Sequence, residues 1–172
     1  MTSGRAEAVG SALRALVLAC MASWVGIMAF FSFIAAPRLF RTLERREAGE
    51  PVAALLPAYY QWGIALSGLA VGALVVLAAR AGAGRLRHLA GASLGAVMVV
   101  CLVWALGVSL PAANRARRAG DDAAFAATHR QALRLNVLVL LCGVAVVVLE
   151  ACTSSCWRGQ SLPPPDLPVR AR

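Results

Sequence analysis

The stretch Pro111–Asn136, PAANRARRAGDDAAFAATHRQALRLN, lies between two long apolar blocks and decides the fold. It begins with an arginine cluster, turns at Gly120 and restarts at an acidic pair, which is typical of a connection between two membrane helices. Phe125, His129 and Asn136 follow at steps of four and seven, so we expect them to share one stripe of a helix that continues into the last apolar block.

The apolar blocks on both sides of this stretch predict a membrane protein. The chain has 172 residues, 60% of them hydrophobic, and a mean hydropathy of +0.72, which exceeds what a soluble domain shows. A span needs about 20 apolar residues. Four stretches qualify, so we predict an all-α, four-span transmembrane helical bundle over residues 15–154. The spans are about 15–37, 60–79, 89–110 and 135–154.

The two ends are assigned by composition. Residues 1–14 are predicted to be a cytoplasmic N-terminal segment. The first span is too long for the apolar core of a signal peptide, so we expect an uncleaved helix. Residues 155–172 contain a proline run without apolar periodicity, which predicts a disordered C-terminal tail.

The positive charge indicates lipid as the partner. All 17 basic residues are arginines, the net charge is +9, and the arginines lie in the gaps between apolar blocks. We therefore expect contact with anionic lipid head groups of the bilayer, and no nucleic acid. Arg80, Arg85 and Arg87 lie in a short connection without an acid, which favours cytoplasmic termini in the cell (inner) membrane.

The two longer connections follow similar patterns. Each has a proline, an arginine-rich run, an Ala-Gly pair, an acid and a second helix, which predicts interfacial helices between spans 1 and 2 and between spans 3 and 4. Gly49 and Gly120 suit helix C-caps. Asp121 or Asp122 suits an N-cap, and Pro51 suits a first helical turn. This order predicts a two-helix repeat.

Small residues recur within spans 2 and 3. Gly68-x3-Gly72 and Gly91-x3-Gly95 have the spacing that lets helix backbones approach closely. The pattern fits both a tight inner hairpin and a seam between subunits, and so allows a homo-oligomer or a membrane-protein partner.

The chain resembles the transmembrane protein 205-like domain family of four-span proteins. The similarity rests on the order and spacing of several short pieces between residues 15 and 152. These are Trp24 with Phe31 and Phe33, Pro37 to Arg41, Leu56 to Tyr60, Asn114–Arg115, Phe125-x3-His129-x6-Asn136, and Glu150. One departure is Ala132, where the pattern has a small hydroxyl residue. The resemblance implies the fold and a membrane location, and little chemistry.

The candidate binding residues are polar groups at the membrane boundaries. His129, Arg130 and Asn136, joined through the resemblance by Asn114 and Arg115, are candidates for binding an anionic or small polar ligand. The competing interpretation is that His129 and Asn136 only join neighbouring helices.

Glu150 is an acid inside the last apolar block. We expect it to form an ion pair with Arg14 or Arg80, or to couple to a proton or cation. His88, Glu150, Cys152 and Cys156 are a less favoured soft-metal set.

No catalytic motif of a soluble enzyme is present, so we expect no catalytic residues and no cofactor. His88 and His129 fall at opposite membrane faces, too far apart to share one haem or metal ion. The expected function is transport or membrane homeostasis of a metal or small polar solute. The alternatives are a non-catalytic scaffold or assembly subunit and a small membrane oxidoreductase subunit.

Overall fold

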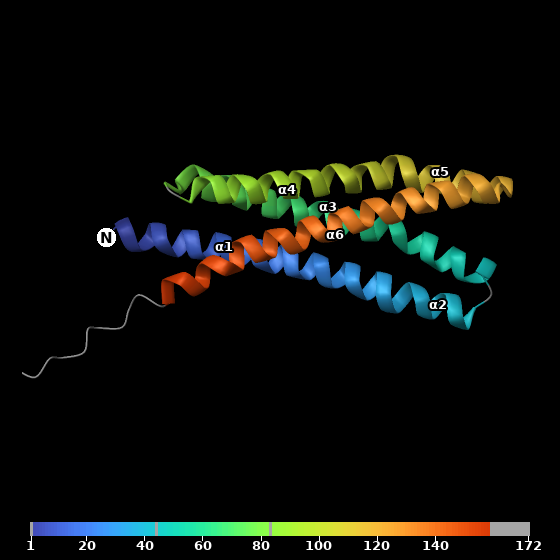
Figure 1. Cartoon of the computed structure of the whole chain (residues 1–172), viewed down its shortest axis with the longest axis horizontal. Helices are drawn as coiled ribbons and strands as arrows, with labels where there is room; N and C mark the ends of the chain where they lie inside the picture. The colour runs from blue at the N-terminus through green and yellow to red at the C-terminus, as the bar shows by residue number, and fades with distance from the viewer. Residues whose placement is uncertain (1, 44, 83, 159–172) are drawn as a thin grey trace, which may run out of the picture.

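The computed structural model describes residues 2–43, 45–82 and 84–158, with side chains for all of these except 2–3, 45–48 and 153–158. These residues form four long helical rods that run up and down in one elongated bundle, as Figure 1 shows. The rods are α1–η1–α2, α3, α4–η2–α5 and α6. Their elements are α1 (Thr2–Phe30), η1 (Phe31–Ala35), α2 (Ala36–Thr42), α3 (Arg45–Arg80), α4 (Arg85–Trp104), η2 (Ala105–Ser109), α5 (Leu110–Ala119) and α6 (Asp122–Arg158).

The predicted all-α, four-span bundle is confirmed. Four helices, Gly4–Thr42, Gly49–Arg80, Arg85–Ala119 and Asp122–Cys152, are long and apolar enough to cross a membrane. Around the bundle, α1 packs against α3 and α6, and α4 packs against the same two helices. The N-terminus, the α3–α4 connection and the end of α6 lie together at one end, here called the terminus end (Figure 1).

The helices are longer than the predicted spans. Residues 2–14 belong to α1. Both longer connections are mostly helical, since α2 and α5 continue the rods before them and α3 and α6 begin ahead of their apolar blocks. Their alanines and arginines are good helix formers, so the helix continues beyond the apolar block. The predicted tail, 155–172, lies outside the described residues from 159 onward.

The two connections turn in different ways. Gly120 is the C-cap of α5 at φ 70°, and Asp121 Oδ1 accepts a hydrogen bond from the Ala124 backbone N–H at 2.9 Å, so both predicted caps are confirmed. The predictions for the first connection are wrong. Gly49 and Pro51 lie inside α3, because α2 ends earlier, at an extended Leu43. Instead of capping a helix, the Gly49 carbonyl accepts a hydrogen bond from Arg117 Nη1 at 2.9 Å.

A π-helical segment precedes the proline of each connection. The N–H of Ala36 donates to the carbonyl of Phe31, and the N–H of Leu110 donates to that of Ala105, so both bonds span five residues. The following Pro37 and Pro111 have no N–H to continue the usual four-residue pattern. The offset, from 31 to 105 and from 37 to 111, is 74 residues in both cases, which supports the predicted repeat of two halves.

The interior is filled by large side chains. Trp24 is fully buried, and its ring lies so close to Gly63 of α3 that a Cβ placed there would be 2.5 Å from Trp24 Cζ2. On α4, Gly91 and Gly95 face Leu74 and Val71 of α3. These two glycines therefore allow α3 and α4 to pack closely, as the predicted tight inner hairpin requires. Gly68 and Gly72 differ, because a Cβ on them would have no neighbour within 4 Å.

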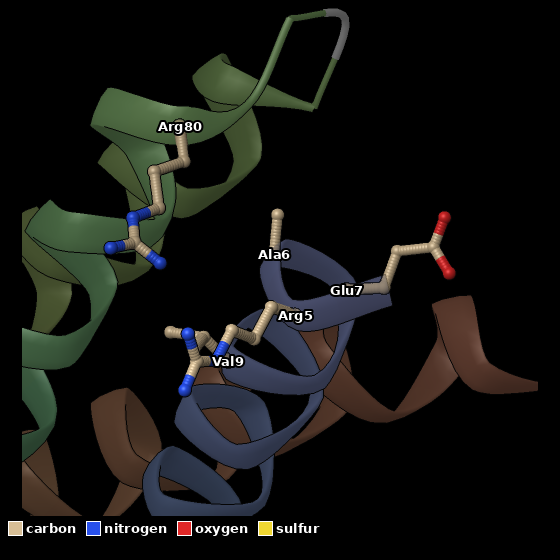
Figure 2. Close-up of a pocket in the computed structure, with 5 residues that line it drawn as sticks. All are labelled: Arg5, Ala6, Glu7, Val9 and Arg80. Atoms are coloured by element: carbon tan, nitrogen blue, oxygen red, sulfur yellow. The ribbon is translucent and has the colours of Figure 1, made fainter. Parts of the chain in front are cut away.

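A wide, shallow surface pocket of about 730 Å³, lined by exposed residues, lies at the terminus end between the start of α1 and the end of α3 (Figure 2). Arg5, Ala6, Glu7, Val9 and Arg80 line it.

The contact between Trp24 and Gly63 predicts a sensitive position. Gly63→Ala should lower the free energy of unfolding in detergent by about 1–3 kcal/mol, because the added methyl group overlaps the buried indole ring. Gly68→Ala on the same helix is the matched control, and we expect no loss of stability there. Thermal unfolding followed by tryptophan fluorescence measures both variants. Equal stability of the two variants would contradict this packing.

Candidate functional site: a buried charge cluster at the terminus end

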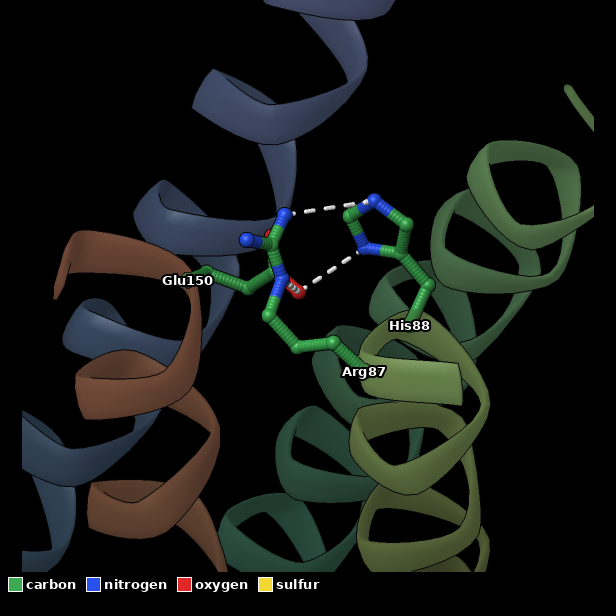
Figure 3. A network of polar contacts seen from close by, with 3 residues as sticks. All are labelled: Arg87, His88 and Glu150. Carbon is green, nitrogen blue, oxygen red and sulfur yellow. Dashed lines mark hydrogen bonds and ion pairs between the residues drawn. The ribbon is translucent and has the colours of Figure 1, made fainter. Parts of the chain in front are cut away.

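Three ionisable side chains meet between α4 and α6, near the terminus end of the bundle (Figure 3). His88, in the first turn of α4, is 1% exposed, and Glu150 of α6 is 2% exposed. His88 Nδ1 lies 2.9 Å from Glu150 Oε1, and Arg87 Nε lies 3.7 Å from the same oxygen. Arg87, His88 and Glu150 are called the charge cluster below.

The contacts of His88 favour one tautomer of its neutral ring. Arg87 Nη2 lies 3.4 Å from His88 Nε2, and a guanidinium group can only donate, so Nε2 is the acceptor. The proton of the neutral ring is then on Nδ1, from which it is donated to the Glu150 carboxylate. The cluster thus places a guanidinium group and an imidazole ring against one buried carboxyl group.

Close packing of the helices brings these residues together. Gly91 follows His88 by one turn on α4, and a Cβ placed there would lie only 4.0 Å from Glu150 Oε1. On α6, Glu150 continues a buried face formed by Val139, Cys142 and Val146. The carboxylate therefore points into the bundle, where a charge is costly unless a cation and a hydrogen-bond donor face it.

The cluster differs from the expected ion pair of Glu150. Sequence reasoning proposed Arg14 or Arg80 as its partner, whereas the described structure places Arg87 and His88 against it. Arg87 was missed as a site residue, because the arginines of its connection indicated orientation only. Its position next to a histidine at the start of a span was the available signal.

The proposed soft-metal set is brought together only in part. His88 and Glu150 meet, Cys152 is exposed, and the side chain of Cys156 lies outside the described residues. Over the side chains that the structure describes, no group of three potential ligands could hold a metal ion. The Arg87 guanidinium beside the pair would also repel a metal cation.

The residues of the predicted stripe, Phe125, His129 and Asn136, lie at the end of the bundle opposite the terminus end. Two of them are at the surface and one is half-buried. Phe125 and His129 stack with ring centroids 6.0 Å apart and an interplanar angle of 11°, and His129 is exposed. Asn136 is half-buried, and its Oδ1 accepts a hydrogen bond from the Tyr59 hydroxyl at 3.4 Å. His129 thus lies at the surface, whereas Asn136 is hydrogen-bonded to a buried side chain.

The remaining predicted binding residues lie near the surface. Arg115 and Arg130 are exposed, and Asn114 is half-buried. Within the described part of the chain, no side-chain hydrogen bond or ion pair involves Asn114, Arg115, His129 or Arg130.

An aromatic cluster beside Asn136 was missed. Tyr59 lies between Trp24, Phe31 and Tyr60, with ring centroids 4.8, 5.0 and 5.3 Å away. Tyr59 and Tyr60 are both buried, whereas Phe30, Phe33 and Trp62 are more than half exposed. The tyrosines thus close the core at the end that Asn136 occupies.

Comparison with known proteins assigns the family. The family described as "Domain of unknown function (DUF4149)" matches residues 19–122, more than half of the chain. The chain belongs to the DUF4149 family. The matched region contains the second and third rods and the part of the first rod from residue 19 onward. It includes Arg87 and His88, whereas Glu150 lies beyond it.

A relative of this DUF4149 chain comes from Aquifex aeolicus (strain VF5). This uncharacterized protein is 43% identical over 56 residues, which make up 33% of the chain and 42% of the relative. The chain therefore covers less than half of that relative's length. No solved structure matches the chain.

The charge cluster predicts a stability difference between two carboxylates. Glu150→Gln should lower the free energy of unfolding by about 2 kcal/mol, because it removes a charge-assisted hydrogen bond and leaves Arg87 without its counter-ion. Glu7→Gln changes an exposed acid at the same end, and we expect an effect within about 0.5 kcal/mol. Chemical denaturation in detergent measures both variants. Similar small effects would rule out a stabilising cluster.

The inferred proton position predicts a spectroscopic signature. In the neutral ring of His88, the Nδ1–H form should dominate, because Nε2 faces a donor. Solid-state ¹⁵N NMR of histidine-labelled protein in lipid, with His129→Gln to leave one histidine, reports the form directly. A dominant Nε2–H ring would contradict the assignment.

Proposed function

We propose that this multi-pass membrane protein serves transport or membrane homeostasis of a small polar solute, with the charge cluster as its proton-binding centre. The observation that carries the proposal is the 2.9 Å contact between a nearly fully buried histidine and a nearly fully buried glutamate inside a membrane bundle. Ionisable groups in such a place are costly and are used for proton or ion relay in pumps and transporters.

The cluster is built so that a proton would change its contacts. Protonation of His88 would put an N–H on Nε2, opposite the Arg87 donor 3.4 Å away. Two donors repel, so Arg87 would leave the ring. Arg87 can move because its side chain is 21% exposed, whereas those of His88 and Glu150 are held in the interior. Proton uptake would thus be linked to a displacement of Arg87.

Buried polar groups without partners favour a polar solute over a metal ion. The buried Trp24 Nε1 and Ser67 Oγ have no hydrogen-bond partner among the described residues, and Ser67 lies one turn after Gly63, which contacts Trp24. These groups, with Tyr59 and Asn136, offer donors and acceptors to a small neutral or anionic solute. Among the side chains that the structure describes, no group of three potential ligands offers a comparable site to a metal cation.

Membrane reconstitution tests the proposal. Proteoliposomes are exposed to an inward proton gradient, and proton entry is followed with an enclosed pH-sensitive dye, with and without a mixture of small polar solutes. We expect wild-type protein and Glu7→Gln to show solute-dependent proton entry, and Glu150→Gln to lose at least nine-tenths of it. Equal proton entry with wild-type protein and Glu150→Gln would refute the role of the cluster.

The second candidate is a scaffold or assembly subunit. It is favoured by Gly68 and Gly72, which face outward on α3 and leave room for the backbone of another helix. Native mass spectrometry in detergent tests it. An oligomer or a co-purified membrane protein that disappears in Gly68→Ile with Gly72→Ile, and persists in Val100→Ile on exposed α4 surface, would favour this role.

We also propose membership in the transmembrane protein 205-like domain family and a location in the cell (inner) membrane with cytoplasmic termini. The ordered sequence pieces support the family membership, and the three arginines of the α3–α4 connection support the cytoplasmic termini.

The orientation is tested by cysteine labelling in a background without native cysteines. An impermeant maleimide should label Ala123→Cys in intact cells and Gly82→Cys only after permeabilisation; the reverse pattern would invert the topology.

A further inference from the structure

Two arginines from distant parts of the chain face the pocket at the terminus end. Arg5 lies near the start of α1 and Arg80 is the last residue of α3. In Figure 2 both guanidinium groups point into the space between the helices, whereas the Glu7 carboxylate points away from it. Ala6 and Val9 supply an apolar wall beside the two charges.

The two guanidinium groups, Arg5 and Arg80, give this pocket a positive charge that an anion would neutralise. Within the described residues, no carboxylate lies within ion-pair distance of Arg5 or Arg80, since the ion pairs found there belong to Arg87 and His88. Guanidinium groups facing each other repel, and a shared oxyanion between them turns that repulsion into two charge-assisted interactions. Arg87 does not serve this pocket, because Glu150 engages it.

The position of the pocket indicates the class of anion. Arg5 and Arg80 lie at the ends of the candidate spans Gly4–Thr42 and Gly49–Arg80, where a bilayer places its head groups. A phosphoryl group offers three or more oxygens to planar guanidinium donors, which suits two arginines better than one. The apolar wall at Ala6 and Val9 matches the glycerol and acyl start of a phospholipid.

We propose that the Arg5–Arg80 pocket is a binding site for a phosphoryl group, supplied by the head group of an anionic phospholipid or by a free phosphate. This site is distinct from the charge cluster and goes beyond the proposed proton-linked function. Its ligand binds at the membrane surface, between α1 and α3.

Lipid titration with the full-length protein tests the site. Phosphatidylglycerol and phosphatidylcholine are titrated separately in detergent and followed by native mass spectrometry. Each arginine near a charged head group contributes about fivefold, so Arg5→Gln with Arg80→Gln should weaken phosphatidylglycerol binding about 30-fold. Arg85→Gln, an exposed arginine at the same end that does not line the pocket, should change it by less than about fivefold.

A second arm distinguishes the two sources of the phosphoryl group. Binding of ³²P-labelled inorganic phosphate by equilibrium dialysis, lost in the double variant, assigns a soluble ligand. Selective phosphatidylglycerol binding without phosphate binding assigns a lipid. The proposal is overturned if wild-type protein binds neither probe, if the double variant binds as wild-type protein does, or if Arg85→Gln weakens binding equally. Size-exclusion chromatography confirms that each variant is folded.

Discussion

A carboxylate buried inside a membrane bundle is the constraint on which the terminus end of this structure depends. Glu150 is 2% exposed, and transfer of a charge from water into such surroundings costs several kcal/mol unless partners replace the lost water. Two side chains take the place of the lost water: His88 contributes a hydrogen bond to the carboxylate, and Arg87 contributes a positive charge beside it. The need to bring these partners within reach is met where α4 faces α6 at Gly91, since a Cβ placed there would lie 4.0 Å from Glu150 Oε1.

The proline-linked π-helical segments impose a second constraint, shared by the two halves. In each half a five-residue bond precedes a proline, and the rod continues as α2 or α5 without a break. A π-helical bond accommodates the missing N–H while keeping most carbonyls paired, which matters where no water can substitute. The equal offset of 74 residues therefore reflects repetition of one structural solution rather than repetition of side chains.

Features of the fold that depend on local sequence could be predicted, whereas those that depend on tertiary packing could not. The four helices are set by long apolar blocks, and the turn at Gly120 by a glycine followed by an N-cap acid, so local sequence was sufficient. Gly49 and Pro51 suggested an equivalent turn, but the chain instead turns at Leu43, where no glycine or N-cap signal was recognised. Tertiary packing, invisible in one sequence, buried Tyr59 and selected Arg87 over Arg14 and Arg80 as the partner of Glu150.

The polar groups at the two ends are separated by an apolar layer, and this separation distinguishes the candidate functions. Between Asn136 and Glu150, a distance of about 21 Å along α6, the buried face consists of Val139, Cys142 and Val146. Met21 and Met98 fill the same interior from α1 and α4. Movement of a polar solute through this layer requires a second packing of the rods, because a filled apolar core excludes it. Transport thus needs two arrangements, whereas a scaffold needs only this one, so detection of a second arrangement when His88 takes up a proton separates the two functions.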